Sequence, residues 1–70
     1  MLSQQIVETL TEERKRQGLT QRELSERMDC ALSFVQMFEY RTRDPRLSTV
    51  ERYAKALGVV TWEDFAGIRK

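Results

Sequence analysis

Apolar residues recur at three- and four-residue spacing along most of this chain, which is the spacing of an amphipathic helix. They begin with a set that marks a first helix over about residues 3–17, namely Leu2, Ile6, Val7 and Leu10. Gly18 follows and fits the left-handed residue that commonly comes just past a helix end. No segment shows the strict alternation of a strand, so the pattern predicts an all-α protein.

Capping signals place the next two helices. Thr20 with Glu23 three residues later forms a capping box, which opens a second helix that should stop near Met28. A tight turn at Asp29 and Cys30 then leads into a third helix of about residues 31–40. It must end before Pro45, because a proline restricts the residue before it to extended conformations.

The last third of the chain predicts two more helices. Ser48 with Glu51 is a second capping box, and the helix that it opens should end at Gly58. Thr61 with Asp64 starts a last short helix, which folds back onto the core. The residues predicted to pack this core are Leu24, Met28, Val35, Phe38, Val50, Tyr53, Ala54, Leu57, Trp62 and Phe65.

Length and composition narrow the classes of protein. Seventy residues are enough for a single domain, residues 1–70, with a small margin of stability. Twelve Lys and Arg against eleven Asp and Glu leave a net charge of +1, so any nucleic-acid contact depends on where the charges lie. Cys30 is the only cysteine, which excludes an internal disulfide and predicts a reduced, buried thiol in the cytoplasm. No apolar run reaches the roughly 18 residues of a membrane span, and no signal peptide is visible.

The residue types that most enzymes need are scarce. The chain has no histidine, which argues against a metal site and against histidine-based acid–base catalysis. Its three glycines lie far apart, so they form no phosphate-cradling loop. The carboxylates lie on charged helices, where such groups are normally solvated. We therefore expect no enzymatic activity and no cofactor.

Three stretches together resemble the XRE family, the Cro and phage-repressor-like helix-turn-helix domains: GLTQRELSERM, RDPRLSTVERYAKALGV and TWEDF. The resemblance covers about residues 6–65. It implies a compact five-helix bundle with the lambda-repressor-like DNA-binding fold. In that fold the second helix crosses the DNA backbone and the third enters the major groove, often in a homodimer on a palindromic operator. The resemblance thus implies a small transcriptional regulator with double-stranded DNA as its partner.

The resemblance also assigns roles to individual residues. Gln21 matches a glutamine that contacts a phosphate and supports the third helix, and Arg14 and Glu39 match a structural ion pair between the first and third helices. The positions that usually face bases hold Leu32, Ser33, Phe34, Gln36 and Met37. The loop that often touches the DNA backbone holds Arg41, Thr42 and Arg43. The region that often forms the dimer surface supplies the candidates Trp62, Phe65 and Ile68.

Basic residues gather near the two ends of the helix-turn-helix in the expected fold. Such side chains can flank a groove and contact phosphates, but they also fit a solvated face on which acidic residues are interspersed. The set comprises Arg14, Lys15, Arg16, Arg22, Arg41, Arg43 and Arg46.

The third helix departs from the family in its chemistry. With Val35 pointing inward, a turn of about 100° per residue puts Ala31 and Phe38 on the buried side and Met37 on the opposite side. Base readout favours Arg, Lys, Asn and Gln, whereas this helix offers only Ser33 and Gln36 for hydrogen bonds to bases. Two glycines that the family commonly has are also replaced, by Asp29 in the turn and by Arg41 at the helix end.

Two functions therefore remain open. In the first, the protein reads thymine-rich DNA and DNA shape through the third helix. In the second, the helix-turn-helix serves protein binding through the apolar face of that helix, as an antiactivator that masks a transcriptional activator or in an antitoxin-like manner.

Overall fold

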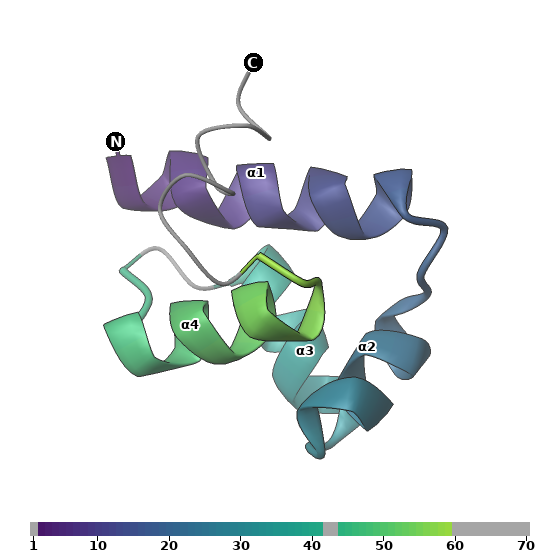
Figure 1. Cartoon of the computed structure of the whole chain (residues 1–70). Helices are drawn as coiled ribbons and strands as arrows, with labels where there is room; N and C mark the ends of the chain where they lie inside the picture. The colour runs from purple at the N-terminus through teal and green to yellow at the C-terminus, as the bar shows by residue number, and fades with distance from the viewer. Residues whose placement is uncertain (1, 42–43, 60–70) are drawn as a thin grey trace.

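The computed structural model describes residues 2–41 and 44–59, which form four α-helices and no strand. The helices are α1 (Leu2–Arg16), α2 (Gln21–Met28), α3 (Leu32–Tyr40) and α4 (Leu47–Ala56). α1 runs along one side of the bundle and packs against α3 and α4, while α2 packs against α3 and α4 from the other side (Figure 1). The all-α prediction is confirmed. The segment expected to form a fifth helix, with Trp62, Phe65 and Ile68, lies outside the described residues.

Glycines end two of the helices as predicted. Gly18 and Gly58 have φ angles of 74° and 84°, in the left-handed region that favours glycine. After α1, the amide of Gly18 donates to the carbonyl of Lys15 at 2.9 Å, and after α4 the amide of Gly58 donates to the carbonyl of Lys55 at 3.0 Å. These bonds satisfy carbonyls that the helix ends would otherwise leave without a partner.

The predicted capping box at the start of α2 is confirmed. The Thr20 hydroxyl accepts a hydrogen bond from the Glu23 amide at 3.0 Å, and the Glu23 carboxylate accepts one from the Thr20 amide at 2.9 Å. The bond from the backbone amide of Thr20 is the main reason why the pKa of Glu23 lies below its ordinary value, and the Thr20 side chain adds to the effect.

The capping box predicted at Ser48 and Glu51 is wrong. α4 begins at Leu47 with Arg46 as its N-cap, and no side chain caps it. The extended conformation ends at Arg46, whose carbonyl accepts hydrogen bonds from the amides of Thr49 and Val50 at 3.0 Å each. Ser48 is therefore already inside the first helical turn, too far along the chain to act as an N-cap.

A matched pair of variants distinguishes the two helix starts. Thr20→Ala should lower the free energy of unfolding by about 1 kcal/mol, because it removes a cap that is in use. Ser48→Ala should change it by less than about 0.5 kcal/mol, as for other exposed sites with no special contact. Urea denaturation followed by circular dichroism measures both values. Equal losses in the two variants would contradict this assignment of the caps.

The core lies where the four helices meet. Its buried apolar residues are Val7, Leu10, Leu24, Met28, Val35, Phe38, Tyr53, Ala54, Leu57 and Val59. The rings of Phe38 and Tyr53 stack with centroids 4.8 Å apart, which joins α3 to α4. The predicted core residues that the structure describes are buried, apart from Val50, which is half-buried. Cys30, expected to be buried, is only partly so.

Ala31 corrects another prediction. It was expected on the buried side of the third helix, but it is exposed, because it is the extended N-cap residue that precedes the first turn of α3.

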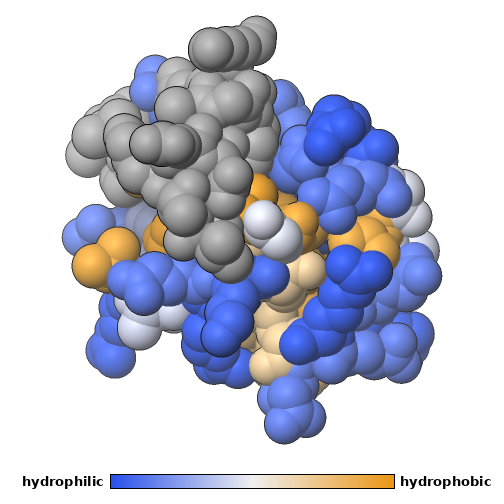
Figure 2. All heavy atoms as spheres, viewed as in Figure 1, coloured by the Kyte–Doolittle hydropathy of each residue, from blue (hydrophilic) through white to orange (hydrophobic). Residues whose placement is uncertain are grey.

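The surface around the core is largely hydrophilic on the face that Figure 2 shows, with small hydrophobic areas between the polar side chains.

Candidate nucleic-acid interface

The turn between α2 and α3 brings the two helices close together. Asp29 ends α2 in the left-handed conformation, with φ 54°, where the family commonly has glycine. The amide of Cys30 donates to the carbonyl of Ser25 at 3.0 Å and closes the turn. Ser25 is buried, and its hydroxyl donates to the carbonyl of Arg22 at 2.6 Å. The hydroxyl therefore has a hydrogen-bond partner within α2, as a buried polar group requires.

The carboxylate of Glu39 connects α3 to the other three helices. Arg14 of α1 donates to it from Nε at 2.8 Å and from Nη2 at 3.0 Å. Gln21 of α2 donates to it from Nε2 at 3.0 Å, and Tyr53 of α4 donates from its hydroxyl at 2.5 Å. The Glu39 side chain is only 1% exposed and that of Arg14 only 8%. This cluster, which we call the Glu39 network, fixes the orientation of α3 within the bundle.

The Glu39 network also changes the protonation equilibria of its members. Burial raises the pKa of Tyr53 well above its ordinary value, and the hydrogen bond to Glu39 raises it further. Burial on its own would lower the pKa of Arg14, but the hydrogen bond and the charge of Glu39 outweigh this and raise it. Arg14 also donates to the carbonyl of Leu19 at 2.7 Å. Its guanidinium therefore serves the interior of the protein and is not placed to contact a phosphate.

Gln21 is the first residue of α2 and is partly exposed. One N–H of its side-chain amide donates to Glu39. The second N–H and the oxygen of this amide can bind other partners. Its position at the start of α2 suits both roles that the family resemblance assigns to it, which are support of α3 and contact with a phosphate.

The outer face of α3 is exposed and unusually apolar. Met37 is 58% exposed, Tyr40 76% and Phe34 37%, while Leu32 is half-buried. The exposed polar side chains on this helix are Ser33 and Gln36. The five positions predicted to face bases or a partner thus share one helix, and four of them are exposed.

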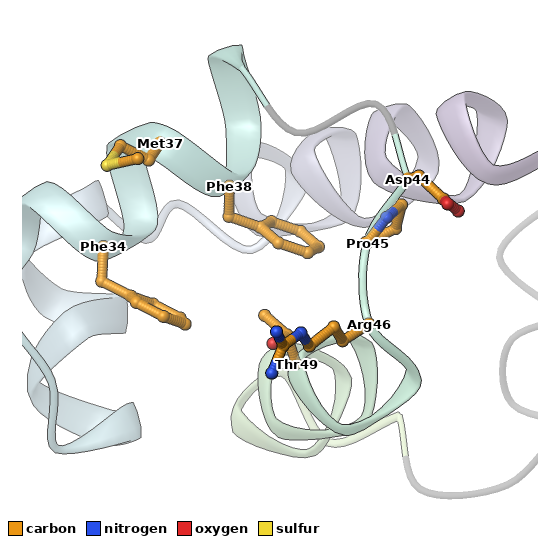
Figure 3. Close-up of a pocket in the computed structure, with 7 residues that line it drawn as sticks. All are labelled: Phe34, Met37, Phe38, Asp44, Pro45, Arg46 and Thr49. Carbon is orange, nitrogen blue, oxygen red and sulfur yellow. The ribbon is translucent and has the colours of Figure 1, made fainter.

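A groove runs between α3 and the start of α4. It has a volume of about 340 Å³ and is lined by Phe34, Met37, Phe38, Asp44, Pro45, Arg46 and Thr49. In Figure 3 the rings of Phe34 and Phe38 project from α3 toward Thr49 and Arg46 on the opposite wall. The guanidinium of Arg52 lies 5.8 Å from the centre of the Phe34 ring and donates to the carbonyl of Met28 at 2.9 Å. The cation thus makes a favourable contact with the aromatic ring at the edge of the groove.

The basic residues of the predicted cluster have different surroundings. Arg22, Arg41 and Arg46 are exposed, as is Lys15. Arg16 is exposed too, but it binds the buried carboxylate of Glu13, with an Nε–Oε1 distance of 2.6 Å. This hydrogen bond is the main reason why the pKa of Glu13 is lowered. Thr42 and Arg43 lie outside the described residues.

The described residues form neither a metal-binding cluster nor a membrane-spanning helix. Residues 2–41 and 44–59 contain no group of three side chains that could hold a metal ion. None of the helices there is long and apolar enough to cross a membrane.

Residues 10–65 match the protein family described as Helix-turn-helix, which is four fifths of the chain. The chain belongs to this helix-turn-helix family. The family is that of the XRE and lambda-repressor-like domains, as the sequence resemblance indicated, and its members are DNA-binding domains of transcription regulators. No curated protein and no solved structure matches the chain significantly.

Membership of the helix-turn-helix family identifies which of the elements described above form the motif. α2, the turn at Asp29 and α3 are the motif itself, and the match extends from α1 past the end of α4. Within this motif the Glu39 network holds the inner side of α3, while the outer side is left exposed. Sequence reasoning missed Tyr53 as a member of the network and Pro45, Thr49 and Arg52 as neighbours of the exposed face.

Proposed function

We propose that this protein is a transcription regulator that binds double-stranded DNA as a homodimer and places α3 in the major groove. The observation that carries the proposal is the arrangement of α3. Its inner side is fixed to the other three helices through the Glu39 network, and its outer side presents Ser33 and Gln36 in a domain of a DNA-binding family. A rigid helix with an exposed face is what readout of base edges requires.

Each part of the motif has a separate task in this proposal. Gln36 and Ser33 hydrogen-bond to base edges, and the exposed apolar side chains of α3 contact the bases beside them. Gln21 and Arg22 at the start of α2, together with Arg41 at the end of α3, contact phosphates. Phosphate contacts of this kind position the domain on the duplex without reading its sequence.

Protein binding is the second candidate function, and a specific observation favours it. Met37, Tyr40 and Leu47 are between 58% and 76% exposed, and large exposed apolar side chains on a small domain are typical of a protein interface. A partner such as a transcriptional activator would then cover α3 and the start of α4. The mechanism would be steric in either case, because the protein would cover a promoter in the first function and a regulator in the second.

In vitro selection from a randomised duplex library, at near-physiological salt, tests the first function against the second. We expect enrichment of a palindromic motif by the folded protein, because a homodimer presents two equivalent α3 helices. Failure to enrich any motif, from protein that circular dichroism shows to be helical, would refute sequence-specific DNA binding and favour the protein partner.

Gln36→Ala should weaken binding to the selected site by about 5- to 150-fold, since a bidentate contact to a base edge contributes roughly 1–3 kcal/mol. The loss should disappear on duplexes changed at the base pair that Gln36 reads. Gln5→Ala is the matched control, because Gln5 is an exposed glutamine on α1, outside the motif. Fluorescence anisotropy titration measures the affinities. Equal affinities for Gln36→Ala and Gln5→Ala would rule out readout by Gln36.

Arg22→Ala should reduce the slope of log Kd against log salt by about 1, because one phosphate contact is lost. Arg27→Ala removes the same charge from the other end of α2, where the guanidinium donates to the carbonyl of Ala56 at 3.3 Å. We expect a smaller change of slope for that variant. Affinity titrations at four or five salt concentrations give the slopes, and a larger change for Arg27→Ala would place the DNA backbone elsewhere.

A further inference from the structure

The groove between α3 and the start of α4 combines an apolar lining with basic side chains at its edges. Its lining is mainly apolar, with Phe34, Met37, Phe38 and Pro45 and the methyl-bearing Thr49. Two arginines lie at its edges. Arg46 is one of its lining residues, and the guanidinium of Arg52 lies 5.8 Å from the centre of the Phe34 ring. Among the described residues that line it, Asp44 is the one acidic side chain (Figure 3).

We propose that this groove receives the 5-methyl groups of thymines in the major groove, so that Phe34 and Met37 determine the preference for A·T pairs. The inference rests on the proposed function and names the bases that the same face of α3 would read. Thymine is the base whose major-groove edge carries an apolar group, and apolar side chains recognise that group by contact. The cations at the edges match the phosphates that flank every thymine.

The geometry explains how so apolar a helix can select a sequence. Phe34 is 37% exposed, and its ring lies 5.8 Å from the guanidinium of Arg52, which also donates to the carbonyl of Met28 at the end of α2. The contact with Arg52 favours this orientation of the ring, and a side chain that already has its bound orientation loses less entropy on binding. Met37 is more exposed and has an adaptable side chain, which can close over a methyl group from the other side.

Replacement of thymine by deoxyuridine in the selected duplex tests this directly, because it removes the methyl group and leaves base pairing intact. We expect about a threefold to fourfold loss of affinity at each thymine whose methyl enters the groove, the value for removing one buried methyl-sized group. Phe34→Ala and Met37→Ala should bind the thymine duplex more weakly and should no longer distinguish it from the deoxyuridine duplex. Gln5→Ala, at an exposed residue of α1 outside the motif, should keep the distinction.

The outcomes separate this inference from the function on which it rests. Tight, sequence-selective binding by the unaltered protein that is equally strong with deoxyuridine would overturn the methyl readout and leave DNA binding standing. This comparison needs no variant, so misfolding cannot obscure it. Absence of selective binding to either duplex would overturn both, and capture of a protein partner at α3 would then be the better account of the groove.

Discussion

Glu39→Ala is expected to lower the free energy of unfolding by about 3–5 kcal/mol, because it leaves the charge of Arg14 buried without its partner. The pair is almost inaccessible to solvent, with 1% of the Glu39 side chain and 8% of the Arg14 side chain exposed. Tyr53 and Gln21 would lose their acceptor in the same step. Exposed ion pairs contribute only about 0–1 kcal/mol, so burial is what makes this substitution severe.

The loss would be a large part of what holds the domain together. A domain of this length has a total stability of roughly 3.5–10 kcal/mol at about 0.05–0.15 kcal/mol per residue. Each kcal/mol lowers the Tm of such a domain by about 4–8 °C, so Glu39→Ala should melt at least about 12 °C below the unaltered protein. Thermal and urea denaturation measure the effect. Glu26→Ala, an exposed glutamate on α2, is the control and should stay within about 0.5 kcal/mol of the unaltered protein.

A double variant separates the cost of an unpaired charge from the cost of a lost contact. Arg14→Met combined with Glu39→Met leaves no buried charge, and we expect it to be more stable than Glu39→Ala alone. Tyr53→Phe removes one hydrogen bond to a charged acceptor and should cost about 1.5–3 kcal/mol. If Glu39→Ala were no less stable than Glu26→Ala, the Glu39 network would not be what holds α3 in place.

The helices were largely predictable because their signals are local. The capping box starts its helix within three residues, from Thr20 to Glu23. The two glycines likewise end α1 and α4 within a few residues of their own positions. The failure at Ser48 has the same origin. Its pattern with Glu51 is a valid capping box, but Pro45 and the extended Arg46 start the helix two residues earlier, and sequence spacing does not reveal which start is used.

The site was less predictable because its contacts join distant parts of the chain. The pairing of Arg14 with Glu39 came from the family resemblance, since nothing local to either residue indicates a partner 25 positions away. Tyr53 was taken as a packing residue, which it is, but its hydroxyl also completes the Glu39 network. The apolar excess of α3 was visible in the sequence. The groove beside it was not, because part of its lining comes from Asp44, Pro45 and Arg46 on the approach to α4.

Met37→Glu should weaken operator binding strongly and leave the fold intact, so that it separates an effect on DNA binding from an effect on stability. Met37 is 58% exposed on the outer face of α3, so a polar side chain there should change the free energy of unfolding by about 0.5 kcal/mol or less. In the complex, a carboxylate at this position would face bases and phosphates in a desolvated interface. We expect affinity to fall at least about thirtyfold, or roughly 2 kcal/mol, and further at low salt where phosphate repulsion is less screened.

Two controls define what the result of Met37→Glu means. Gln5→Glu adds the same charge on α1, and a small effect there would show that net charge is not the cause of the loss. Met37→Leu keeps an apolar side chain and should retain most of the affinity. A Met37→Glu protein that binds the operator as tightly as the unaltered protein would mean that α3 does not enter the major groove. In that case the exposed apolar face of α3 would have to be explained by a protein partner, because the core accounts only for its opposite side.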